Sequence, residues 1–228
     1  MDRCVLFDVN KTLVRDSKDV SEYMTESIRT IYGVITEANV EQYEGMAVRD
    51  IAAAILKQNG VEPQIIEEKM DHLIDDVPYS YYNVAGHDDL IKSEGAQELL
   101  DEIKRKGALI GIASGEPERM VRQRLENRSI NEYFKFGAFG NEAKTLPEIV
   151  SLAVKKAANE FRITNSRIAI VSSSPHMIKA ARSMGIFTIG VANGSFSEAQ
   201  LKEAGASLVV KSLKDRGRIV DAVFKGLR

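Results

Sequence analysis

The first residues of the chain place a buried strand directly before a polar turn. Four consecutive apolar residues, Cys4 to Phe7, are typical of a strand that is covered on both faces. Asp8 follows at once, and Thr12 comes four residues later. In an open parallel sheet, ligands bind beyond the carboxyl ends of the strands. The segment therefore indicates either a functional carboxylate or an aspartate that opens a turn.

Between residues 15 and 85 the apolar positions repeat at helical spacing. Three helices are predicted: from Asp16 or Ser17 to about Tyr32, over residues 48–56 before Gly60, and from Pro63 onward. The apolar stripe of the first helix consists of Val20, Met24, Ile28 and Ile31. Residues 15–82 contain no strand pattern, so we expect a block of helices inserted after the first strand.

From about residue 86 the pattern alternates between helix and strand. Strands are predicted over residues 109–113, 134–139, 168–171, 187–191 and 207–210, and helices over residues 96–106, 117–126, 146–161, 175–184, 197–203 and the C-terminus. This alternation predicts an α/β fold with a doubly wound parallel sheet and helices on both faces. We expect an α/β core of residues 1–14 and 86–228, with residues 15–85 forming a separate helical domain.

Composition and charge narrow the possible partners. The chain has 228 residues, of which 44% are hydrophobic, so it can bury a sizeable core. The net charge of -2 gives no basic surface for nucleic acid. The single cysteine, Cys4, suits a reducing compartment, and the three histidines are scattered. With no apolar run of about 18 residues and no signal peptide, we expect a cytoplasmic protein without a membrane partner. The oligomeric state stays open.

Polar residues follow three of the predicted strands in a recognisable order. Asp8 comes after the first strand, Ser114 after the second, and residues 172–174, all serine, after the fourth, while Lys144 precedes the long helix. In this order the chain resembles the haloacid dehalogenase superfamily of hydrolases, and in particular its phosphoglycolate-phosphatase-like branch with a helical cap. Residues 44–46 are similar to a short cap motif of that branch, and residues 186–191 resemble the strand after the fourth motif.

The resemblance implies a role for each of these residues. Asp8 would attack phosphorus and form an aspartyl-phosphate. Thr12 and Ser114, with Gly115 beside it, would bind the phosphoryl oxygens, and Lys144 would neutralise the phosphate and hold the nucleophile. The substrate would be a small phosphorylated molecule, and the cap would close over the site and exclude water.

Two positions depart from this resemblance. Where the phosphatases carry a second aspartate as general acid and base, this chain has Asn10, whose amide cannot donate and recover a proton. In the fourth motif Ser173 stands at the position of a magnesium ligand, and Met177 stands at a later acidic position. Asp8, the main-chain carbonyl of Asn10 and Ser173 would then bind Mg²⁺ weakly, because the ion commonly needs only one or two carboxylates.

Other groups in the sequence can take over the missing functions. Glu116 and Glu142 are acidic candidates, and His176 in the fourth motif is a candidate proton carrier. On the resemblance alone, restoring both acids with Asn10→Asp and Ser173→Asp is expected to raise magnesium-dependent phosphatase activity.

Three functions therefore stay open. The first is a phosphatase-type hydrolase weakened by Asn10 and Ser173. The second is a metal-independent hydrolase like the haloacid dehalogenases, whose fourth motif also begins with two serines, with Arg15 or Arg49 as the binder of a substrate carboxylate. The third is a catalytically silent domain that binds a ligand or a partner.

Overall fold

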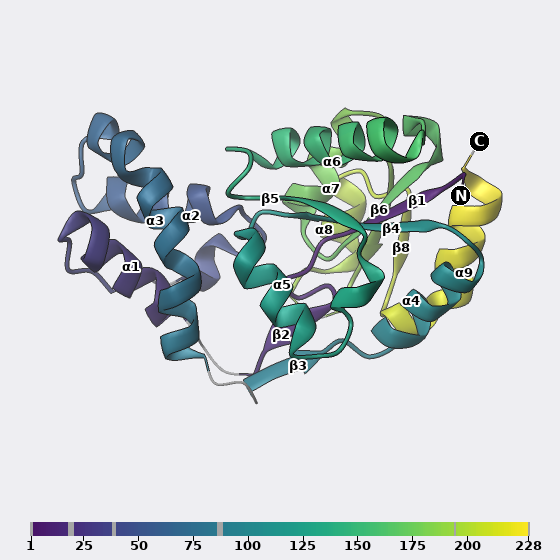
Figure 1. Ribbon diagram of the computed structural model, residues 1–228, viewed down its shortest axis with the longest axis horizontal. Coiled ribbons are helices and arrows are strands. Elements are labelled where there is room, and N and C mark those ends of the chain that lie inside the picture. Colours follow the sequence, from purple (N-terminus) through teal and green to yellow (C-terminus); the bar gives the residue numbers. More distant parts are fainter. Residues whose placement is uncertain (1, 18–20, 38–39, 86–88, 194, 228) are drawn as a thin grey trace.

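The computed structural model describes residues 2–17, 21–37, 40–85, 89–193 and 195–227. Figure 1 shows a sheet covered by helices beside a separate group of three helices. Arg3 donates hydrogen bonds to the main-chain oxygens of Val223 and Leu227, so both ends of the described chain lie together. They lie at the end of the sheet that is remote from the three helices, and the first strand runs from there toward those helices.

The main sheet contains six parallel strands within the described ranges, in the order β5-β4-β1-β6-β7-β8. Their bounds are β1 (Cys4–Phe7), β4 (Leu109–Ser114), β5 (Phe136–Phe139), β6 (Ile168–Ser172), β7 (Phe187–Val191) and β8 (Leu208–Val210). Phe7 at the end of β1 pairs with Ile112 of β4 and Val171 of β6. The residues that follow these three strands therefore meet at one edge, at the point where the strand order reverses.

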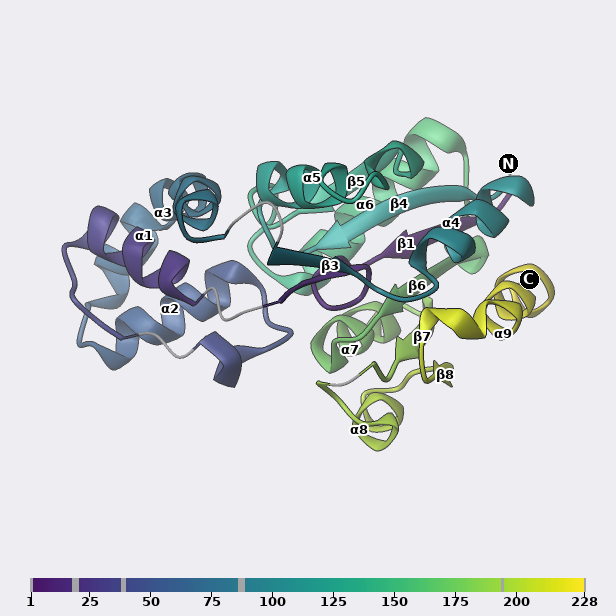
Figure 2. The same ribbon diagram turned by 90° about the horizontal axis from the view of Figure 1, so that it is seen from below.

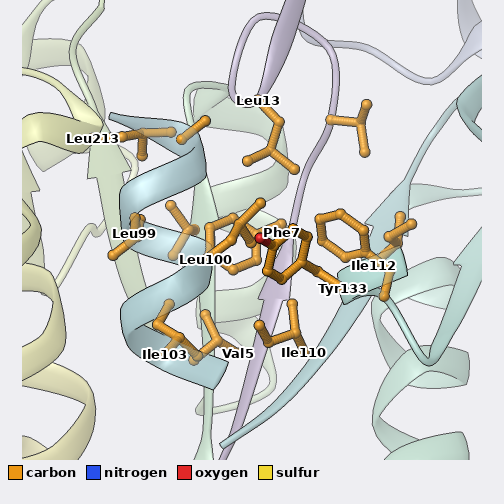
Figure 3. Packing of buried hydrophobic residues seen from close by; sticks show 14 of the residues in the cluster. Val5, Phe7, Leu13, Leu99, Leu100, Ile103, Ile110, Ile112, Tyr133 and Leu213 are labelled. Carbon is orange, nitrogen blue, oxygen red and sulfur yellow. The ribbon is translucent and has the colours of Figure 1, made fainter. Parts of the chain in front are cut away.

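Alternating residues of β1 face two different hydrophobic clusters. Val5 and Phe7 pack against helices on one face, while Cys4 and Leu6 pack against helices on the other. The first face is covered by α4 (Ala96–Arg105), α5 (Glu118–Glu126) and α9 (Arg216–Asp221), and the second by α6 (Leu146–Phe161) and α7 (Pro175–Ser183). Figure 3 shows Leu100 of α4 beside Phe7. This arrangement confirms the predicted α/β fold with a doubly wound parallel sheet.

Three helices pack on one another outside the sheet. They are α1 (Glu22–Tyr32), α2 (Val48–Gln58) and α3 (Pro63–Val84), and together with the segments that join them they are called the helical unit below. Their apolar stripes form a third cluster, to which α5 contributes Met120. The chain enters and leaves this unit through a short antiparallel pair, β2 (Val14–Asp16) with β3 (Leu90–Lys92). In the part of the chain described, no helix is long and apolar enough to span a membrane.

The pair of β2 and β3 corrects two expectations. Residues 15–82 were expected to contain no strand, yet Asp16 lies in β2 and does not cap a helix, and α1 begins only at Glu22. Three-residue strands are too short for an alternating pattern, and each of these two is stabilised by a partner far away in the sequence. Val20 of the expected stripe, and the expected domain boundary at residue 86, fall outside the described residues.

Candidate active site

The carboxyl ends of β1, β4 and β6 open into a pocket of about 670 Å³. The helical unit lies beyond these strand ends, as Figure 2 shows for β4. The lining includes Asp8, Asn10, Arg15, Asp16, Ser114, Gly115, Glu116, Ser173 and Ser174, with Glu44, Met46 and Val48 from the helical unit. The sequence proposes ten residues for the site or as substitutes in it, and the structure brings six of them to this pocket: Asp8, Asn10, Ser114, Gly115, Glu116 and Ser173.

Asp8 is held at both carboxylate oxygens. Its Oδ1 accepts a hydrogen bond from the main-chain nitrogen of Val9 at 2.8 Å, and its Oδ2 accepts one from the hydroxyl of Ser172 at 2.7 Å. The residue is only 7% exposed. Burial raises the pKa of Asp8 to about 7; the Ser172 hydrogen bond opposes this shift, and the charge of Glu116 adds to it. Asp8 is thus a fixed carboxylate that ionises near neutral pH.

The serines after β6 form a hydroxyl network with Thr12. The Ser173 nitrogen donates to Thr12 Oγ1 at 2.9 Å, and the two hydroxyls lie 3.0 Å apart. Ser174 caps α7 through the nitrogen of Met177 and donates to the main-chain oxygen of Gly45 in the helical unit. Thr12 is fully buried and does not line the pocket. In this arrangement its hydroxyl supports the fourth motif, whereas the sequence predicts that it binds a phosphoryl group.

A buried arginine that the sequence patterns do not predict contacts three residues of the pocket wall. Arg124 of α5 is 1% exposed. Its Nη1 donates to Glu116 Oε1 at 2.6 Å, and its Nη2 donates to Asp16 Oδ2 and to Asn10 Oδ1, both at 3.1 Å. The hydroxyl of Tyr81 in α3 donates to the other oxygen of Asp16 at 2.5 Å. The signal for Arg124 is its place among the buried residues of α5, where an apolar side chain is expected.

Lys144 is the predicted catalytic residue that the structure does not bring to Asp8. Its ammonium group pairs with Glu67 of α3, where both side chains are mostly exposed, and it does not line the pocket. Lys144 lies two residues before the start of α6, and its side chain is 63% exposed. Lys144 therefore forms a salt bridge between the core and the helical unit. Its predicted role, to neutralise a phosphate and hold Asp8, is not supported by a contact in this structure.

Among the other candidates from the sequence, Glu142, His176 and Arg49 also lie outside the pocket. Glu142 pairs with Lys156 at 2.7 Å, and His176 is an exposed residue in the first turn of α7. Arg49 donates to the main-chain oxygen of Gly140 and pairs with Asp71. Of the two arginines considered for a substrate carboxylate, Arg15 alone lines the pocket.

The side chains that the resemblance implies as magnesium ligands already have hydrogen-bond partners within the protein. Asp8 Oδ2 already accepts the Ser172 hydroxyl, and the Ser173 hydroxyl faces Thr12. The Asn10 amide oxygen accepts from the cationic Arg124. Among the described residues, no group of three or more His, Cys, Asp or Glu side chains is placed to hold a metal ion. The ligand that the resemblance implies at Asn10 is the main-chain carbonyl and not the side-chain oxygen, so the weak magnesium site stays a prediction.

The contact between Asn10 and Arg124 bears on the expectation for restoring the two acids. A carboxylate at position 10 would face the guanidinium group of Arg124, which favours the ionised form and lowers the pKa of that carboxylate. The gain in magnesium-dependent phosphatase activity that is expected from the combined Asn10→Asp and Ser173→Asp change stays a prediction.

The helical unit directly contacts the loops that form the site. The Val48 nitrogen donates to the main-chain oxygen of Gly115 at 3.1 Å, and Lys11 pairs with Glu44 at 2.9 Å. A Cβ atom added to Gly115 would lie 2.7 Å from the Cα atom of Ala47. Only glycine allows this approach. Gly115, which the sequence assigns to substrate binding, thus lines the pocket and also allows the helical unit to pack closely on this loop.

Comparison with known proteins agrees with this fold. The sequence matches the haloacid dehalogenase-like hydrolases over residues 5–191. The chain belongs to this family of hydrolases, which confirms the predicted resemblance.

Individual relatives are distant in sequence but cover most of the chain. A phosphoglycolate phosphatase of Vibrio cholerae is 21% identical, over 84% of this chain and 85% of that protein. A phosphorylated carbohydrates phosphatase of Thermotoga maritima is 29% identical over 54% of this chain and 56% of that protein. The crystal structure of a hydrolase from Pseudomonas syringae superposes with a TM-score of 0.74 at 16% identity, covering 97% of this chain and 99% of that one. At this identity the structural match shows the fold alone.

Replacing Arg124 by methionine is expected to destabilise the protein in a pH-dependent way. The change leaves Glu116 and Asp16 beside the pocket without their cation, so the free energy of unfolding at pH 8 should fall by about 3–5 kcal/mol. At pH 5.5 the loss should be smaller, because the unpaired carboxylates take up protons. Urea unfolding at both pH values measures the difference. Arg119→Met, on the exposed side of the same helix, is the control, and an equal loss for Arg124→Met at both pH values would contradict this account.

Asp8→Asn is expected to stabilise the protein, and more so at high pH. The pKa of Asp8 is about 7 in the folded protein and about 4 in the unfolded chain, so the wild-type protein loses stability as the pH rises between these values. The gain from Asp8→Asn should therefore be larger at pH 8 than at pH 5 by about 2–3 kcal/mol. Urea unfolding in the presence of a chelator tests this, with Asp75→Asn, a change at an exposed residue of the helical unit, as control. A gain that does not vary with pH would disprove the raised pKa.

Proposed function

We propose that the chain is a phosphatase-type hydrolase that acts on small phosphorylated metabolites through Asp8. The observation that carries the proposal is the position of the Asp8 carboxylate: it is buried at the reversal point of the sheet, fixed at both oxygens, and part of the pocket wall. Relatives named as phosphatases of phosphoglycolate and of phosphorylated carbohydrates support the substrate class.

The chemistry proceeds in two displacements at phosphorus. A carboxylate oxygen of Asp8 attacks, the bond from phosphorus to the leaving oxygen breaks, and an aspartyl-phosphate forms. Water then attacks the phosphorus, inorganic phosphate leaves, and the carboxylate of Asp8 is restored. The Ser114 hydroxyl lines the pocket, and α5 and α7 begin at this edge of the sheet, where the partial positive charge of their N-termini favours an anion.

In this proposal the helical unit acts as the cap, with residues 15–85 as the inserted domain. Its contacts with Gly115 and Ser174 close the pocket on the side away from the sheet. Exclusion of water protects the aspartyl-phosphate and strengthens every electrostatic interaction in the site. The side chains of the unit that line the pocket then select the substrate.

The hydroxyl of Ser172 favours a second candidate chemistry. It donates to Asp8 Oδ2, an arrangement that suits a carboxylate working without a metal ion. In that case Asp8 would displace halide from carbon, and Arg15 in the pocket wall would bind the substrate carboxylate. No leaving-group acid is needed in that reaction, because halide leaves as a stable anion.

Phosphate release from a panel of small phosphate esters, with and without Mg²⁺, tests the proposal. We expect the wild-type protein to turn over at least one ester and to form a trappable phosphoenzyme, and Asp8→Asn to lower turnover by on the order of 10³-fold or more. Asp75→Asn in α3 is the matched control. Halide release from 2-haloacids without phosphate release would favour the second chemistry, and ligand binding without either product would indicate a silent domain.

A further inference from the structure

Lys11, in the loop that follows Asp8, has a backbone conformation that residues with side chains rarely adopt. Its φ angle is 56°, in the left-handed region that favours glycine. Two other described non-glycine residues have a positive φ, Ser129 and Arg162, and neither of them lines the pocket, whereas Lys11 does. Because glycine would adopt this conformation without strain, the strain at Lys11 indicates that its side chain has a purpose in the pocket.

The main chain of Lys11 is fixed on both sides. Its nitrogen donates to the main-chain oxygen of Val14 at 2.7 Å, and its oxygen accepts from the side-chain amide of Asn193, in the loop after β7. Lys11 follows Asp8 by three positions, so the Cα atoms of the two residues lie at most about 11 Å apart. The backbone therefore holds this lysine close to the candidate nucleophile.

The ammonium group of Lys11 lies where the pocket meets the helical unit. It pairs with Glu44 at 2.9 Å, and both side chains keep access to solvent, with exposed fractions of 36% and 22%. Glu44 lines the same pocket. A lysine has three donors on a flexible stem, so a single carboxylate partner leaves donors for a second anion. A ligand in the pocket can therefore reach this cation.

The charges of the pocket show why a phosphoryl group would need Lys11. The described lining holds two cations, Lys11 and Arg15, and Lys11 belongs to the same loop as the nucleophile. Arg124 is buried behind the wall, where both of its terminal nitrogens already have acceptors, and Lys144 pairs outside the pocket. The carboxylates of the lining come from four residues: Asp8, Asp16, Glu44 and Glu116.

We propose that Lys11 is the phosphate-binding cation of this pocket, and that Glu44 competes with the phosphoryl group for it. The proposal rests on the phosphatase-type function proposed above, and it gives Lys11 the charge neutralisation that the sequence predicts for Lys144. Without an anion in the pocket, the ammonium group pairs with Glu44. When a phosphate ester binds, the ammonium group donates to a phosphoryl oxygen in a charge-assisted hydrogen bond. Its positive charge then reduces the repulsion between the phosphoryl group and the Asp8 carboxylate.

A purely structural role of the ion pair leads to a different expectation. If the pair of Lys11 and Glu44 only holds the helical unit on the core, removing either partner weakens that contact, and both changes lower the affinity for phosphate. If Glu44 and the phosphate compete for Lys11, removing Lys11 lowers the affinity and removing Glu44 raises it. The sign of the change in the Glu44 variant therefore separates the two roles.

The affinity for inorganic phosphate is measured by isothermal titration calorimetry, with and without Mg²⁺ and at constant ionic strength. The variants are Lys11→Gly, which adopts the left-handed conformation without strain, Lys11→Arg, which keeps the charge, and Glu44→Gln. The matched controls are Lys202→Gln and Glu198→Gln, which remove an ion pair of α8 (Glu198–Glu203) outside the pocket. Circular dichroism confirms that each variant is folded.

We expect Lys11→Gly to weaken phosphate binding by about 10–100-fold, the range for a hydrogen bond to a charged group. Lys11→Arg should stay within about 5-fold of wild type, because it keeps a cationic donor. Glu44→Gln should tighten phosphate binding by about 2–10-fold, and this gain should disappear when it is combined with Lys11→Gly. Lys202→Gln and Glu198→Gln should each leave the affinity within about 2-fold of wild type.

The outcomes separate this proposal from the phosphatase-type function. Equal phosphate affinity of Lys11→Gly and wild type overturns the role of Lys11, and so does a wild-type protein that binds no phosphate. An affinity that Glu44→Gln lowers or leaves unchanged, or a gain that persists in the double variant, overturns the competition with Glu44. The phosphoenzyme of the ester panel decides the catalytic function separately: opposite changes in Lys11→Gly and Glu44→Gln without any phosphoenzyme support the anion site and overturn the phosphatase-type function alone.

Discussion

The pairing of one guanidinium group with several carboxylates is the interaction on which the rest of the site depends. Glu116 and Asp16 line the same pocket as Asp8, and burial of their negative charges is unfavourable without compensation. Arg124 supplies that compensation from the core side, with its planar donors directed at three different acceptors. A lysine in its place could not reach all three with fixed geometry.

The resulting charge balance sets what each carboxylate can do. Arg124 contacts Glu116 and Asp16 but does not hydrogen-bond Asp8, which is stabilised by two neutral donors instead. A neutral donor lowers the pKa of a carboxyl group less than a cation does, so Asp8 keeps its pKa near neutrality. The site therefore contains one carboxylate that is held by neutral donors and two that are held by a cation, although all three are aspartate or glutamate side chains.

Local patterns predicted the strands and the residues at their ends, and they failed where the partners are distant. The apolar run before Asp8 and the serines after β6 are visible in a few consecutive residues, and the structure places both at the same sheet edge. Arg124 was missed because a charged residue in a helix reads as exposed until its acceptors are known, and these are up to 114 positions away. The pairing of Lys144 with Glu67 is also not visible in the residues around position 144, because the two partners lie 77 positions apart in the sequence. The short strands β2 and β3 are likewise fixed only by each other.

The hydrogen bond from Tyr81 to Asp16 joins the orientation of the helical unit to the electrostatics of the pocket. Tyr81 belongs to α3, Asp16 to the strand through which the chain enters the unit, and Arg124 to the core. If α3 moved away, Asp16 would lose a neutral hydrogen-bond donor. Arg124 would then stabilise the Asp16 carboxylate more and the Glu116 carboxylate less. The strand β2 therefore couples the position of α3 to the way in which Arg124 shares its positive charge between Asp16 and Glu116.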